Sequence, residues 1–127
     1  MATYLDFLKE QGRHLSEINP GSDEIALTAD DAFKALELLQ NSQTAVLGGD
    51  ILSEKNNELI YAYQVWGEEY QYLNWYCDKD EKESIESYLQ RSHIVAKEGI
   101  ANAIKIAEKF AMRCYIVFVI QYHYNSF

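Results

Sequence analysis

The chain has 127 residues, with twenty acidic and eleven basic side chains and a formal net charge of −9. Apolar residues make up 48% and aromatic residues 13%, which is enough for a core and argues against a disordered chain. A net negative field repels phosphate backbones, so it argues against nucleic-acid binding and favours a basic partner. We expect one domain over residues 1–127.

Targeting and redox signals are sparse. The first fifteen residues carry four charged side chains and no apolar run of signal-peptide length. The most hydrophobic stretch, Cys114 to Ile120, is too short to cross a bilayer. We therefore expect a cytoplasmic protein without a membrane partner. Cys77 and Cys114 are too few for a disulfide scaffold and lack CxxC spacing, which favours two reduced thiols.

The first half of the chain alternates helical and extended patterns. Residues 3–16 are predicted to form a helix, and residues 24–27 a short strand or an extended entry to the next element. Thr28 is placed to cap a second helix over 29–41. Residues 45–53 are predicted to form a strand with a bend or bulge at the glycine pair in its middle.

The second half is richer in aromatic residues. Residues 59–66 and 70–77 surround a short glycine loop, which predicts a β-hairpin. Asp80 and Glu83 form a capping pattern before a long helix near 81–110, and residues 114–124 are predicted to form a last strand. The predicted fold is α+β, an antiparallel sheet of about four strands with helices packed mainly on one face.

We find no specific catalytic constellation. The sequence lacks a GxSxG elbow and a Walker loop, and the histidines His14, His93 and His123 lie on three different predicted elements. The sequence therefore gives no catalytic, cofactor or metal residue. Two readings stay open beside simple binding: a small metal-dependent hydrolase assembled from Asp50, His93 and His123, and a structural module that self-associates through tyrosines.

The acidic side chains are unevenly distributed. Residues 68–86 hold seven acids and two bases, a net charge of −5, whereas residues 87–127 hold two acids and five bases, a net charge of +3. Acids beside exposed tyrosines are a typical composition for protein binding, although acids also cap helices. The candidate partner-binding residues combine charge with aromatic anchors: Glu68, Glu69, Tyr70, Tyr72, Asp78, Asp80, Glu81 and Glu83.

Three segments carry a resemblance to a known family. Residues 45–50 (AVLGGD) follow an amphipathic helix, residues 74–78 read NWYCD, and Glu83-Ser84 leads to residues 87–92 (SYLQRS). In this order and spacing, they resemble the immunity protein 40 family of bacterial polymorphic-toxin systems, from about Leu27 to Ala101. The resemblance implies a cytoplasmic antitoxin that binds a cognate protein toxin, with no catalysis and no cofactor.

The residues of these segments have physical roles of their own. Gly48 and Gly49 suit a bulge or the close approach of another backbone. Trp75 suits a core anchor, and Asp50 is hypothesised to pair with Arg91 or to cap its turn. The motif residues for which we expect a structural role are Gly48, Gly49, Asp50, Asn74, Trp75, Tyr76 and Arg91.

The sequence thus favours an immunity protein that occludes the active or substrate-binding site of a toxin. We expect a monomer or a weak homodimer.

Overall fold

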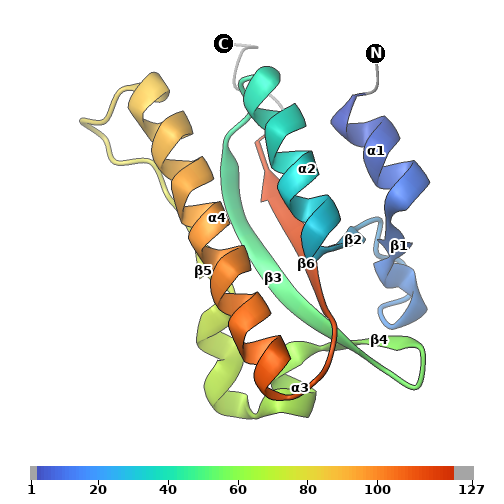
Figure 1. The fold of residues 1–127 in the computed structure, drawn as a ribbon. Coiled ribbons are helices and arrows are strands. Elements are labelled where there is room, and N and C mark those ends of the chain that lie inside the picture. The colour runs from blue at the N-terminus through green and yellow to red at the C-terminus, as the bar shows by residue number, and fades with distance from the viewer. Residues whose placement is uncertain (1–2, 122–127) are drawn as a thin grey trace.

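The computed structural model describes residues 3–121, which form a six-stranded sheet with helices on one face (Figure 1). The first half holds α1 (Tyr4–Gln11), β1 (Arg13–His14), the 3-10 helix η1 (Leu15–Glu17), β2 (Ile25–Thr28), α2 (Ala29–Asn41) and β3 (Val46–Lys55). The second half holds β4 (Glu58–Tyr61), α3 (Ala62–Trp66), the 3-10 helix η2 (Glu68–Leu73), β5 (Trp75–Tyr76), α4 (Ile85–Lys109) and β6 (Cys114–Ile120). The predicted α+β class is confirmed.

Every pairing in the sheet is antiparallel, in the order β1-β2-β6-β3-β4. The ten-residue strand β3 pairs with β6 along one edge. Its other edge is shared, because β4 pairs with residues 52–55 and β5 pairs with Gly48 and Gly49. The register shifts between Val46 and Gly48, which confirms the predicted irregularity at the glycine pair.

The predicted hairpin over 59–77 is wrong. Its two ends pair with β3 instead of with each other, and the residues between them form α3 and η2. Ala62 and Trp66 lie four residues apart and are both buried, which is helical spacing inside a run that is otherwise rich in strand-forming residues. Gly67 then turns the chain at φ 125°, a conformation that favours glycine.

The first predicted helix is shorter than expected, because α1 ends at Gln11. A Cβ at Gly12 would lie 2.1 Å from Ile25 Cγ2, so a residue with a side chain does not fit where the chain passes β2. Arg13 and His14 then pair with β2, and Leu15 packs beneath the other face of the sheet. The cap at Thr28 is confirmed, since its hydroxyl accepts from the Asp31 backbone N–H at 3.2 Å.

The main core lies between the sheet and α1, α2 and α4, which lie side by side in Figure 1. Helix α4 places small buried residues toward the sheet, including Ala96 and Ala103, so its backbone can approach closely. Its N-cap is Ser84 and not Asp80 as the capping pattern predicted, because the Ser84 hydroxyl accepts from the Ser87 N–H at 3.1 Å. The last strand ends at Ile120, and residues 122–124 of the predicted strand lie outside the described part.

Candidate partner-binding surfaces

The eight candidate partner-binding residues fall into two groups at opposite ends of α4. Glu68, Glu69, Tyr70 and Tyr72 belong to η2, beside the C-terminal end of α4, whereas Asp78, Asp80, Glu81 and Glu83 lie in the loop that precedes α4. A helix of 25 residues is about 37 Å long, so the two groups do not form one patch. The segment around β5 causes the separation, because it runs antiparallel to β3 from Asn74, which bonds to Ile51, to Cys77, which bonds to Leu47, and so leads away from η2 (Figure 1).

The η2 end of the molecule is an aromatic cluster with acids at its rim. The Tyr70 ring meets Phe110 edge to face at 5.7 Å between centroids, and the Tyr70 hydroxyl accepts from Lys109 Nζ at 3.2 Å. Phe110 also stacks on Trp66. Tyr70 is therefore engaged within the fold, whereas Tyr72 is 68% exposed.

The acidic loop, residues 77–84, is tied to α4 by Arg91. The Arg91 guanidinium donates to both Glu83 carboxylate oxygens at 2.8 Å and to the Asp78 carbonyl oxygen at 2.6 Å. These bonds hold the pKa of Glu83 down to about 2. Glu83 also accepts from the Asp80 N–H at 3.2 Å. Glu83 is thus a structural clamp, while the side chains of Asp78, Asp80 and Glu81 are exposed.

The hypothesised pair between Asp50 and Arg91 is wrong. Arg91 binds the acidic loop from α4, on the helix-bearing side of the sheet. Asp50 lies between Gly49 and Ile51 on β3, and Ile51 joins the core under the helices. Because neighbouring strand residues point to opposite faces, Asp50 projects to the face opposite α1, α2 and α4.

Trp75 fills the space between β3 and α4. A Cβ at Gly49 would lie 2.2 Å from Trp75 Cη2, and a Cβ at Gly99 would lie 2.8 Å from Trp75 Cε3. A Cβ at Gly48 would lie 2.5 Å from the Trp75 carbonyl oxygen. Asn74 adds a hydrogen bond to β3, since its Oδ1 accepts from the Ile51 N–H at 2.7 Å. These motif residues fasten β5 to β3 and leave Tyr76 83% exposed.

The face of the sheet opposite the helices carries a mixed acidic and aromatic surface. We call it the open sheet face and define it by Glu24, Asp50, Tyr61, Tyr63, Tyr76 and Val119. The Tyr61 and Tyr63 rings stack at 6.1 Å, and Val119 is 42% exposed. Burial raises the pKa of Asp50, and burial together with the Asp50 charge raises that of Glu24. Among residues 3–121, neither carboxylate has a hydrogen-bond or ion-pair partner.

Sequence reasoning did not single out Glu24 or a contact role for Asp50. The signal was the strand alternation after the glycine pair, which places Asp50 and Leu52 on one face and Ile51 on the other. Glu24 follows the same rule, two residues before buried Ala26 on β2.

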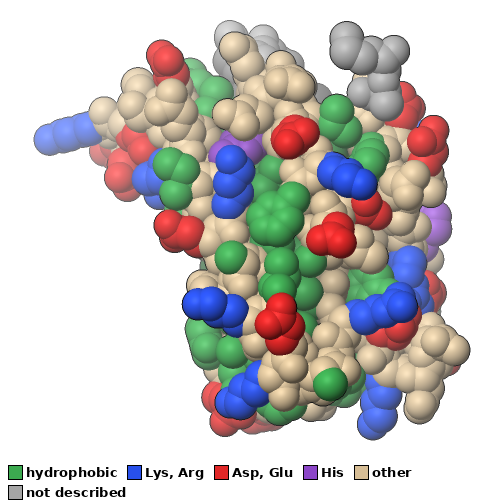
Figure 2. Space-filling view, in the orientation of Figure 1, with side chains coloured by type: hydrophobic (Ala, Val, Ile, Leu, Met, Phe, Trp, Pro, Cys, Tyr) green, Lys and Arg blue, Asp and Glu red, His purple; other side chains and the backbone are tan. Residues whose placement is uncertain are grey.

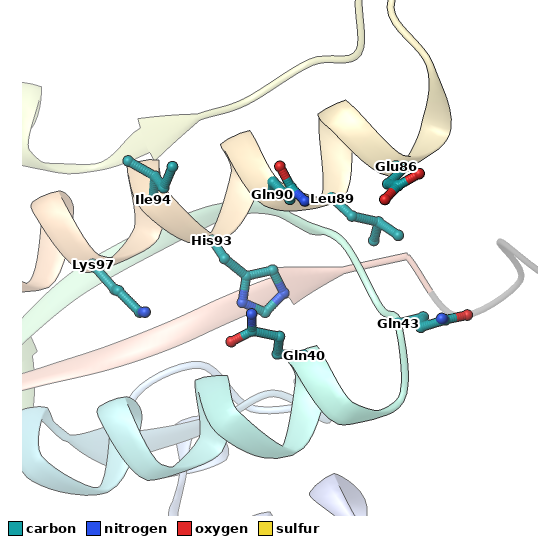
Figure 3. A pocket seen from close by; sticks show the side chains of 8 residues that line it. All are labelled: Gln40, Gln43, Glu86, Leu89, Gln90, His93, Ile94 and Lys97. Carbon is teal, nitrogen blue, oxygen red and sulfur yellow. The ribbon is translucent and has the colours of Figure 1, made fainter.

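A cleft of about 370 Å³ lies between α2 and α4 (Figure 3). It is lined by Gln40, Gln43, Glu86, Leu89, Gln90, His93, Ile94 and Lys97. His93 is only 5% exposed, and its Nε2 lies 2.9 Å from the Thr44 carbonyl oxygen. Figure 3 shows the Gln40 amide beside the His93 ring. Burial is the main cause of a lowered pKa at His93, which favours the neutral imidazole.

The residues suggested for a metal-dependent hydrolase do not come together. His93 faces the space between the two helices, Asp50 faces the opposite side of the sheet, and His123 lies outside the described residues. Residues 3–121 contain no group of three His, Cys, Asp or Glu side chains placed to hold a metal ion.

The two cysteines are buried, free and far apart. The Cys77 N–H donates to the Leu47 carbonyl, whereas Cys114 lies opposite Ser53. Six residues along β3 separate these positions by about 20 Å. Burial raises the pKa of both thiols, that of Cys114 to about 11, which makes them poor nucleophiles.

The helix-bearing face shows no single-sign patch that would suit a phosphate or a membrane surface. Figure 2 shows acidic and basic side chains interspersed over it, with a band of hydrophobic side chains along its middle. None of the helices in the described part is long and apolar enough to span a membrane.

The fold defines a small α+β protein, and its described residues carry exposed acidic and aromatic side chains on several surfaces. A family model described as Immunity protein 40 matches residues 14–120. The chain therefore belongs to the immunity protein 40 family. The match extends beyond the segments that carry the sequence resemblance, from His14 in β1 to the end of β6. The chain matches no curated protein and no solved structure.

Proposed function

We propose that this protein binds a cognate bacterial toxin in the cytoplasm and neutralises it by occluding the active or substrate-binding site. The observation that carries the proposal is the family match over residues 14–120. The proposal assigns the chain no catalysis, no cofactor and no nucleic-acid partner. Its mechanism is a preformed surface that competes with the substrate of the toxin for the same cleft.

The acidic loop supports this mechanism. Arg91 fixes the loop from one side, while Asp78, Asp80 and Glu81 stay exposed on the other. A rigid loop loses little conformational entropy when a partner binds, so more of the contact energy becomes affinity. The net charge of −9 would also accelerate the encounter with a basic toxin.

The η2 end offers a second candidate contact. Glu68 and Glu69 are exposed beside Tyr72, and Tyr70 anchors them to the end of α4 through Phe110. Because this end lies about 37 Å from the acidic loop, a small toxin domain would contact one of the two groups and not both. We favour the acidic loop, where the exposed acids are more numerous and the backbone is clamped.

The test is co-production of the chain with the toxin domain encoded beside its gene, followed by rate measurements. We expect wild-type protein to restore growth and to bind the domain in a salt-dependent manner. The triple charge reversal D78K/D80K/E81K should slow association about tenfold or more at low salt and flatten its salt dependence. A matched reversal on the helix-bearing face, E10K/E37K/E98K, gives the same change in net charge.

Two results would contradict the proposal. Failure of the wild-type chain to bind or to protect would remove the function itself. Equal association rates for the two triple variants would leave the function and remove the acidic loop as the contact. Sedimentation across protein concentrations tests the competing role, since a self-associating module would form a defined oligomer without any toxin, and we expect a monomer or a weak homodimer.

A further inference from the structure

The half-buried acids in the described part of this protein differ in whether a cation lies beside them. Glu54 binds Arg13 and Glu83 binds Arg91, so each of these two carboxylates has a cationic partner within the fold. Asp50 and Glu24 are also partly buried, but no cation meets either of them within residues 3–121. A carboxylate that has lost part of its water and gained no partner is a costly feature for a fold to retain.

Asp50 and Glu24 share one surface. In the sheet register, Asp50 lies opposite Val117 on β6, and Gly48 lies opposite both Val119 on β6 and Tyr76 on β5. Strand β2 borders β6 on its other side, which brings Glu24 within about two strand spacings, ~10 Å, of β3. Burial raises the pKa of Glu24 and of Tyr61, and the nearby charge of Asp50 raises both further, as expected for neighbours on one face.

The surroundings of the acids are apolar and aromatic. Exposed Val119 lies between the strands that carry Glu24 and Asp50, while Tyr61 and Tyr76 flank Asp50 from β4 and β5. The helices α1, α2 and α4 all lie on the opposite face, whereas η1 packs through Leu15 on this one, in a buried cluster that includes Leu52, Leu59 and Val117. The partly exposed area lies beside this cluster and includes Asp50, Tyr76 and Val119. The face therefore combines negative charge with flat rings and a small aliphatic platform.

We propose that the open sheet face receives an arginine side chain of the bound protein, with Asp50 and Glu24 as its anion partners. The inference rests on the proposed function, because the arginine would belong to the toxin. A guanidinium matches two carboxylates through its planar fork of donors, and it stacks on tyrosine rings. Its aliphatic stem would cover Val119. A lysine ammonium, a strongly hydrated point charge, fits flat aromatic walls less well.

Charge complementarity selects this occupant over an apolar one. An apolar partner segment would strip the remaining water from both carboxylates and leave them unpaired, which opposes binding. A guanidinium removes the same water but supplies charge-assisted hydrogen bonds in return. The open sheet face also borders the acidic loop, since Tyr76 precedes Asp78 by two residues. One toxin surface can therefore contact both.

The first experiment does not require the toxin. Amide chemical shifts of the whole protein are recorded by NMR during titration with N-acetyl-arginine methylamide, its lysine analogue and its uncharged citrulline analogue. We expect saturable shifts at residues 48–50 and 117–119 with the arginine probe, at least threefold tighter than with lysine and absent with citrulline. The D50N/E24Q variant should lose them. Shifts that are scattered over the protein, or unchanged in the variant, would overturn the inference.

The second experiment measures the dissociation constant for the toxin domain. D50N/E24Q should weaken binding at least tenfold, mainly through faster dissociation, because a desolvated ion pair is lost. The matched control E10Q/E37Q removes two exposed acids and should change affinity less than threefold. If wild type and both variants bind equally, the arginine inference fails while the proposed function stands. If wild type does not bind, the proposed function fails, and the NMR titration still decides whether the face takes a guanidinium.

Discussion

The Trp75 ring is held between two backbones, and this arrangement predicts the cost of a single methyl group. A Cβ at Gly49 would lie 2.2, 2.6 and 2.6 Å from three atoms of the ring. Gly99 blocks the other side, where a Cβ would lie 2.8 Å from the same ring. The ring cannot retreat from β3 without meeting α4.

The substitution Gly49→Ala should therefore destabilise the protein by about 3 kcal/mol, the upper end of the usual range for overpacking. For a domain of this size, that corresponds to a fall in Tm of about 12 °C. The control is the same change in a W75L background. Leucine removes the ring atoms that clash, so the cost of Gly49→Ala should drop below about 1 kcal/mol, although W75L alone costs about 2–4 kcal/mol.

Urea unfolding of the four proteins in this cycle, followed by circular dichroism, measures the coupling. We expect a coupling of at least about 2 kcal/mol between the two positions. Gly99→Ala gives an independent check, because alanine normally stabilises a helix interior by about 1 kcal/mol. It should destabilise the wild type and stabilise W75L. Additive effects at both glycines would show that the ring is not confined, and would refute the reasoning.

Three further predictions concern charged and polar groups. Arg91→Ala should release the acidic loop, so hydrogen exchange at the amides of residues 78–83 should accelerate. Arg91→Lys should be intermediate, because lysine keeps the charge but lacks the paired donors of the guanidinium. Unchanged exchange would contradict the clamp. His93 has a lowered pKa in the fold, so the unfolded state takes up the proton first, and stability should fall as pH drops below about 6.5. His93→Gln should flatten that dependence between pH 5 and 7 in thermal unfolding, and equal slopes would refute it. Asp50 has a raised pKa, so its ionisation opposes folding above its unfolded value of about 3.9, and Asp50→Asn should keep or raise Tm at pH 7. A clear fall in Tm would reveal a hidden bond at Asp50.

The sequence located most helices because their signals are local. Thr28 precedes its helix and caps it, and the spacing of Ala96, Ile100 and Ala103 marks the buried side of α4. A run of Tyr, Trp and Val is also a local signal, and it favours strands. For this reason the sequence predicts a hairpin where residues 62–73 form α3 and η2. Burial of Ala62 and Trp66 against the sheet outweighed that preference, since tertiary packing can exceed any propensity term.

The candidate surfaces depended more strongly on the fold. The acids of residues 68–86 are one cluster in the sequence, and the path of β5 along β3 divides them. Conversely, Glu24 and Asp50 are 26 positions apart in the chain and become neighbours on one face only through β6. Arg91 shows the same dependence, because the partner expected from the sequence was Asp50, whereas the fold places Arg91 beside Glu83 and Asp50 on the other side of the sheet.

By itself, the sequence determined the net charge, the family resemblance, the α+β class, the helix cap at Thr28 and the irregularity at Gly48 and Gly49. These follow from composition and from residues close together in the chain, where steric and capping preferences act. Only the tertiary structure decided which strands pair, which acids are clamped and which have no cation beside them in residues 3–121. Those outcomes depend on contacts between distant segments, whose burial and Coulomb energies have no counterpart in local sequence.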